Sequence, residues 1–218
     1  MRRLRGLRAL LIGALLIVAS AARLIPGART IDDAFITFRY ARNIVEGQGF
    51  VYNPGVSTLG TTTPLFTLLL TAASAFSGSR DFPQIAIVLS AAADAVTAAL
   101  LYGIARRVMA GMPVGGRTEV GGGRAEARPY DEIIAALPGL LWAVSPMSVT
   151  FAVGGMETSV SILWMTAAVA AFLASPRLGR GALADGAARG DAKPGDPPAR
   201  PYEAALGVFA ALGLLTRA

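Results

Sequence analysis

The chain has 218 residues, of which 54% are hydrophobic and 16% charged, and its mean hydropathy is +0.54. Soluble domains carry charge on about a quarter of their residues, so this composition excludes a soluble domain and predicts a helical membrane protein. The net charge is +6, but the basic residues flank apolar runs and orient membrane spans, which argues against nucleic-acid binding. The absence of His excludes Ser-His-Asp triads, HExxH zinc sites and a His general base within the chain.

The first predicted span covers residues 7–25. Several Arg residues precede it, and Pro26-Gly27 ends it. Ala19-Ser20-Ala21 resembles a signal-peptidase site, so a cleaved signal peptide is the alternative interpretation. The further hydrophobic segments favour an uncleaved anchor. Both interpretations place the N-terminus in the cytoplasm and residue 30 outside.

Residues 30–63 are predicted to form an extracytoplasmic loop with an amphipathic helix at 33–46. Thr30 and Asp33 have the spacing of a capping box, with Asp in place of Glu. Gly47 and Gly49 are expected to stop this helix.

A turn is predicted at Tyr52-Asn53-Pro54-Gly55. The apolar segment that follows, 64–76, is too short for a comfortable span. We therefore expect an in-plane or re-entrant helix there.

Further apolar segments follow, joined by loops rich in Gly and Arg. Spans are predicted at 84–105, 132–150 and 159–174, with the start of another at 202–216. Pro138 and Pro146 predict kinks in the second of these spans. Loops are expected at 106–131, at 151–158 and at 175–201, the last of them disordered.

The charge of the loops predicts the topology. Five Arg residues lie in 106–131, and four Arg with one Lys lie in 175–201, so both loops are expected in the cytoplasm with the N-terminus. An even number of crossings must then separate residue 8 from residue 106, so 64–76 does not cross. The same parity places Asp32-Asp33 and the 151–158 loop together on the extracytoplasmic face.

Acidic residues at three places are candidates for chemistry, namely the pair Asp32-Asp33, Glu157 and Asp94. Positions 32, 36, 39 and 43 share a helical stripe, which aligns Asp32 with Arg39 and Asn43 as a phosphate substrate would need. The alternative is a cap at Asp33 and a surface ion pair from Asp32 to Arg39. Glu157, framed by glycines, is a second candidate or a solvated loop charge. Asp94 lies inside an apolar span, where a functional role competes with one in holding helices together.

Three segments resemble a known family. They are Asp32-Asp33-Ala34-Phe35-Ile36-Thr37-Phe38-Arg39-Tyr40-Ala41-Arg42-Asn43, Gly47-Gln48-Gly49-Phe50-Val51-Tyr52-Asn53-Pro54-Gly55 and Thr63-Pro64-Leu65. Together they resemble the first extracytoplasmic loop of the GT-C superfamily of polyprenyl-phosphate-sugar-dependent glycosyltransferases, in its bacterial arabinofuranosyltransferase and mannosyltransferase-like branch. Gly155-Met156-Glu157-Thr158 resembles the second acidic loop of that family, and Leu214-Leu215-Thr216-Arg217 resembles a later basic turn.

The resemblance implies a polytopic helical bundle in the bacterial inner (plasma) membrane and glycosyl transfer on its outer face. It implies Asp32 or Asp33 as catalytic base, with Arg39, Asn43, Glu157 and Arg217 contacting substrate. A divalent metal such as Mg or Mn, held by Asp33 and Glu157, is a further expectation. The implied partners are the lipid bilayer, a polyprenyl-phosphate-linked sugar donor and a glycan, lipid or protein acceptor.

Two departures from the family pattern stand out. Thr61-Thr62-Thr63 occupies the place where relatives often carry His or Ser before the Pro. The proteins of the family are also longer, so we expect this chain to be an N-terminal portion. The alternative functions are a non-catalytic membrane scaffold and a polytopic transporter or permease, although no internal repeat is seen.

Overall fold

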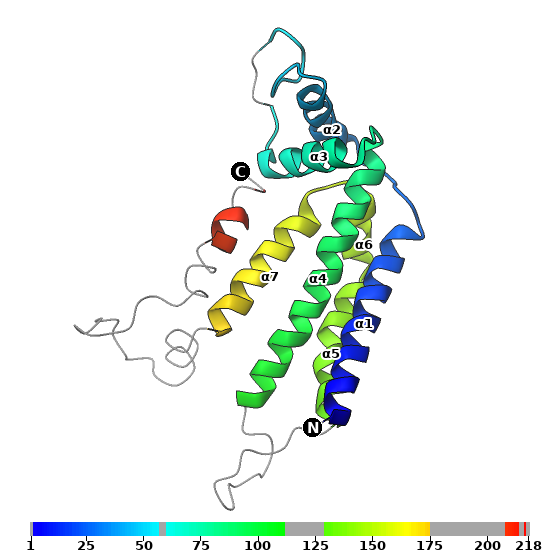
Figure 1. Cartoon of the computed structure of the whole chain (residues 1–218), viewed down its shortest axis with the longest axis vertical. Helices are drawn as coiled ribbons and strands as arrows, with labels where there is room; N and C mark the ends of the chain where they lie inside the picture. The colour runs from blue at the N-terminus through cyan, green and yellow to red at the C-terminus, as the bar shows by residue number, and fades with distance from the viewer. Residues whose placement is uncertain (1, 57–59, 112–128, 175–207, 214–215, 217–218) are drawn as a thin grey trace, which may run out of the picture.

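The protein is described by a computed structural model, which covers residues 2–56, 60–111, 129–174, 208–213 and 216 (Figure 1). These residues are mainly helical, and their only β pairing is an isolated bridge between Asn53 and Val56. The helices are α1 (Arg2–Leu24), α2 (Asp32–Val45), α3 (Pro64–Ser77), α4 (Phe82–Gly111), α5 (Pro129–Val144), α6 (Pro146–Val153) and α7 (Thr158–Ala174).

The chain is a helical membrane protein by the length and apolarity of its helices. Arg3–Leu24 and Phe82–Met109 are each long and apolar enough to cross a bilayer. Pro129–Val144 and Pro146–Val153 make a third crossing if the bent pair is one span. Helices α3 and α7 are apolar but shorter.

The helices form a bundle whose two ends differ. Helix α4 packs between α1 and α5 on one side and α7 on the other (Figure 1). Helices α2 and α3 lie where α1 ends and α4 begins, and α3 runs across the bundle axis. We call this the α2–α3 end, and we call the opposite end, with the start of α1, the N-terminal end. The Gly154-Gly155 turn lies at the α2–α3 end.

The bounds of two predicted loops were wrong, and those of a third are untested. Helix α4 continues to Gly111 and α5 begins at Pro129, so both ends of the predicted 106–131 loop are helical. Helix α6 continues to Val153, which shortens the predicted 151–158 loop to the residues between α6 and α7. The predicted 175–201 loop lies outside the described residues, and of 202–216 only 208–213 and 216 are described, as helix.

The predicted kink at Pro146 is confirmed, because α5 and α6 meet there at 45°. A proline at the first position of a helix cannot extend the preceding one, since it lacks an N–H donor. Pro138 stays inside α5. Its neighbour Gly139 packs so closely on α4 that a Cβ there would overlap the carbonyl oxygen of Ala98.

A buried ion pair joins the bundle internally. The side chains of Arg23 on α1 and Asp94 on α4 are fully buried, and Arg23 Nε donates to Asp94 Oδ2 at 2.7 Å. Ser159 Oγ at the start of α7 donates to the same oxygen at 3.0 Å. This geometry supports the structural interpretation of Asp94, whose partner the sequence analysis did not find.

The remaining donors of Arg23 bind the break between α5 and α6 and one carbonyl of α1 itself. Nη1 donates to the carbonyl of Ala143 at 2.6 Å and to that of Ala19 at 3.0 Å. Nη2 donates to Ser148 Oγ at 2.8 Å. A helix break leaves carbonyl groups without helical partners, and in an apolar bundle each must find a donor. Arg23 supplies these donors at the break.

A second carboxylate is neutralised at the N-terminal end. Glu132 on α5 is buried, and its Oε1 lies 2.6 Å from Arg8 Nη2 on α1. Its Oε2 lies 2.8 Å from Arg106 Nε and accepts a hydrogen bond of 2.6 Å from Tyr102 Oη, both on α4. Arg106 was assigned to a loop from sequence. It extends the helix instead, because its guanidinium pairs with this buried carboxylate.

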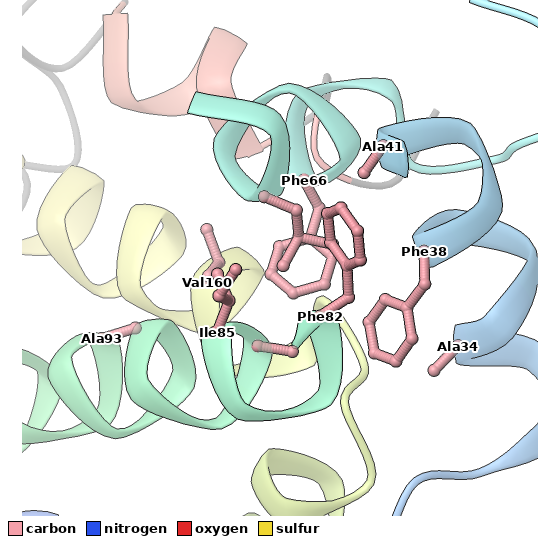
Figure 2. Packing of buried hydrophobic residues seen from close by; sticks show 10 residues of the cluster. Ala34, Phe38, Ala41, Phe66, Phe82, Ile85, Ala93 and Val160 are labelled. Atoms are coloured by element: carbon pink, nitrogen blue, oxygen red, sulfur yellow. The ribbon is translucent and has the colours of Figure 1, made fainter. Parts of the chain in front are cut away.

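A core of aromatic and small residues attaches α2 and α3 to the bundle. Figure 2 shows Phe38, Phe66 and Phe82 gathered between α2, α3 and the start of α4. The rings of Phe38 and Phe82 stack with centroids 6.4 Å apart. Val160 of α7 belongs to the same cluster. The α2–α3 unit is therefore packed onto both α4 and α7.

The Arg23–Asp94 pair gives a first test. Arg23→Met leaves an unpaired carboxylate inside the bundle, and we expect a loss of about 3–5 kcal/mol in unfolding free energy. The double variant Arg23→Met/Asp94→Leu removes both charges and is expected to recover most of that loss. Unfolding in mixed detergent micelles measures both. Equal losses in the single and double variants would contradict the assigned role of the pair.

Candidate functional site

Both predicted catalytic acids lie in the first turn of α2. Asp32 and Asp33 are exposed at the α2–α3 end, and the negative charges are favoured at this helix N-terminus. The predicted capping box is wrong, because the N-cap is Ile31 and no side chain caps the helix. The shift of one residue places Thr30 outside the cap and leaves Asp33 free of a capping role.

The start of α2 is bonded to the turn between α6 and α7. The amide of Arg29 donates to the carbonyl of Val153 at 2.8 Å, and that of Ile31 donates to Gly154 at 3.0 Å. These bonds join segments more than 120 residues apart in the chain. They bring Asp32-Asp33 and the segment that carries Glu157 to one end of the bundle, as the loop parity predicted.

Close packing explains the two glycines before Glu157. A Cβ at Gly154 would lie 2.7 Å from Ile31 Cδ1. A Cβ at Gly155 would lie 2.9 Å from Phe38 Cζ, and Gly155 has a φ of +77°, which few other residues adopt. The turn therefore sits directly on the N-terminal half of α2. Glu157 follows it, half-buried, immediately before α7.

Two polar residues of α2, Arg39 and Asn43, bind the loop that follows this helix. Asn43 Nδ2 donates to the carbonyls of Val51 at 2.7 Å and Tyr52 at 2.9 Å, which uses both of its N–H groups. Arg39 Nε donates to the carbonyl of Tyr52 at 3.2 Å, and its guanidinium lies 5.4 Å from the centroid of that ring. The alternative surface pair from Asp32 to Arg39 is not among the ion pairs of the described residues.

The predicted turn after α2 is confirmed. The amide of Val56 donates to the carbonyl of Asn53 at 3.1 Å, and Gly55 has a φ of +82°. Proline followed by a glycine of positive φ is the pattern of a type II turn. The turn returns Tyr52 and Val56 to the side of α2.

An open groove lies beside the middle of α2. It has a volume of about 340 Å³, and its lining residues include Ile36, Tyr40, Tyr52 and Asn53. Ile36 is one helical turn beyond Asp32, about 6 Å along the axis. Tyr40 is buried, accepts a hydrogen bond of 2.7 Å from the amide of Gly60, and packs against Tyr52 with ring centroids 5.8 Å apart. Tyr40 is not among the site residues that the sequence predicts, although its spacing of four from Ile36 places both on one helix face.

Two of the three threonines that depart from the family pattern, Thr61 and Thr63, belong to a buried hydroxyl cluster, and Thr62 is exposed. Thr63 Oγ1 lies 3.2 Å from Thr37 Oγ1 of α2 and 3.3 Å from Thr61 Oγ1. Thr67 Oγ1 of α3 donates to the carbonyl of Thr63 at 3.0 Å. Buried hydroxyls need such partners. The cluster links the start of α3 to the middle of α2.

Two further predictions concern Arg217 and a metal site. Arg217 lies outside the described residues. Among the residues that the structure covers, no group of three or more acidic side chains gathers as metal ligands. Asp33 with Glu157 as a metal pair therefore stays a prediction.

Comparison of the chain with models of protein families, with curated proteins and with solved structures found no match.

The hydrogen bonds of Asn43 give a second test. Asn43→Ala removes both bonds to the 51–52 backbone, and each is worth about 1 kcal/mol. We expect faster cleavage by chymotrypsin after Phe50 and Tyr52 under native conditions, because the loop opens more often. The exposed neighbour Gln48→Ala is the control. Unchanged cleavage in Asn43→Ala would show that these bonds do not hold the loop.

Proposed function

We propose that the chain is a membrane glycosyltransferase that moves a sugar from a polyprenyl-phosphate donor to a hydroxyl acceptor at the α2–α3 end. One observation carries the proposal: the start of α2, with Asp32 and Asp33, is hydrogen-bonded to the turn before Glu157, and an open groove lies one helical turn further along α2. The arrangement agrees with the resemblance of these segments to the GT-C superfamily.

The chemistry needs one base and one cationic group. The carboxylate of Asp32 or Asp33 takes the proton of the acceptor hydroxyl as its oxygen attacks the anomeric carbon. The bond from that carbon to the phosphate oxygen breaks, and the polyprenyl phosphate leaves with the electron pair. A phosphate is a good leaving group, so no general acid is required. Arg39, exposed next to the groove, neutralises the departing phosphate.

The roles of the other candidates are narrower. Both N–H groups of Asn43 donate to backbone carbonyls of the loop that follows α2. Asn43 therefore holds Tyr52, which lines the groove, in place. Glu157 is assigned a contact with substrate hydroxyls. A divalent ion bound by Asp33 and Glu157 would add positive charge at the phosphate, and no step above is routed through it.

The proposed base gives the third prediction. Asp32→Asn and Asp33→Asn are compared in membranes supplied with a panel of polyprenyl-phosphate pentoses and hexoses. Loss of a general base lowers the rate by about 10²–10⁴-fold, so we expect one of the two variants to fall by that factor. Glu46→Gln, an exposed acid at the end of the same helix, is expected to transfer sugar at the original rate.

Two outcomes would reject the proposal. Full activity in the double variant Asp32→Asn/Asp33→Asn would remove the assigned base. No transfer by the unaltered chain with any donor would favour the alternatives, a membrane scaffold or a transporter.

The membrane orientation gives a fourth prediction, which the absence of Cys makes simple to test. Single Cys residues replace the exposed residues Gln48, Ser77 and Tyr130. A membrane-impermeant thiol reagent applied to spheroplasts is expected to label positions 48 and 77 and to spare 130. Labelling of 130 with protection of 48 would place the acidic residues in the cytoplasm.

A further inference from the structure

A second groove lies on α4 near the N-terminal end of the bundle, away from Asp32 and Asp33. It has a volume of about 460 Å³, within the range of ligand pockets. Its walls are apolar and come from α4 and α7, including Ala99, Gly103, Ile104 and Ala170. Arg106 and Arg107 lie at its end.

The groove exists because the two faces of α4 are packed differently. Ala98 and Tyr102 belong to the core that α4 shares with α1 and α5. Ala99 and Gly103 lie one position further along the helix and line the groove. A Cβ at Gly103 would meet no atom within 4 Å, so the space beside this glycine is open.

The two arginines at the end of the groove differ in their bonding. Arg106 is already paired with the buried Glu132, and its guanidinium lies 5.6 Å from the centroid of the Tyr102 ring. Arg107 is exposed, and no hydrogen bond or ion pair of the described residues involves it. One guanidinium is therefore fixed by the fold, and the next is available at the end of an apolar groove.

We infer that this groove binds an anionic phospholipid, with an acyl chain along Ala99, Gly103 and Ala170 and the phosphate at Arg107. Arginine pairs with phosphate through two N–H groups. Basic pockets between membrane helices are suited to anionic headgroups, and apolar walls suit acyl chains.

Other ligands match the groove less well. Free phosphate would leave the apolar walls without a partner, and a zwitterionic lipid would gain less from Arg107. The groove on α4 and the first turn of α2, which carries Asp32 and Asp33, lie at opposite ends of the bundle. This inference therefore does not depend on the proposed glycosyl transfer.

The test is native mass spectrometry of the purified chain in micelles with equal amounts of dioleoyl-phosphatidylglycerol and dioleoyl-phosphatidylcholine. The unaltered chain is expected to retain the anionic phosphatidylglycerol in preference to phosphatidylcholine. Arg107→Gln should lower its occupancy about fivefold, the equivalent of about 1 kcal/mol for one basic residue near a membrane. Gly103→Leu should displace both lipids, because its side chain fills the open space.

Two controls match these variants. Arg5→Gln removes one exposed charge at the same end, and Gly13→Leu makes the same replacement in α1, where a Cβ also meets no atom. Both are expected to bind lipid like the unaltered chain. Equal retention of the two lipids, an equal loss in Arg5→Gln, no loss in Gly103→Leu, or displacement by millimolar inorganic phosphate would each overturn the inference.

Discussion

The buried pair between Arg23 and Asp94 is the interaction on which the other features of the bundle depend. A guanidinium inside an apolar bundle is costly unless every donor is used and its charge is balanced. Arg23 meets this requirement through Asp94, Ser148 and backbone carbonyls at the break between α5 and α6. Asp94 in turn accepts a bond from Ser159. One side chain therefore determines how α1, α4 and α7 meet the broken helix.

This internal pair also positions the acidic end of the molecule. Arg23 is the penultimate residue of α1, so it sets where the chain leaves the bundle toward Asp32. Ser159 lies two residues after Glu157, so its bond to Asp94 sets where α7 begins. The end of α1 and the start of α7 are thus both bonded to the carboxylate of Asp94. The backbone bonds of Arg29 and Ile31 to the α6–α7 turn then follow from that placement.

The two ends of α4 carry opposite chemistry. At the α2–α3 end, exposed carboxylates lie one helical turn along α2 from a groove that is lined by aromatic residues. At the N-terminal end, Arg8 and Arg106 neutralise Glu132, and Arg107 remains exposed beside an apolar groove. The groove beside α2 supports the proposed sugar transfer, and the groove on α4 supports the proposed binding of anionic lipid.

The sequence by itself determined the helical membrane class, most helix positions and the bend at Pro146, because these depend on local apolarity and on the missing N–H of proline. Loop parity also predicted that Asp32-Asp33 and the α6–α7 turn share one end. Only the tertiary structure decided the partner of Asp94 and the extension of α4 through Arg106. Both depend on contacts between residues distant in the chain, and an isolated Arg beside an apolar run looks the same whether it faces water or a buried carboxylate.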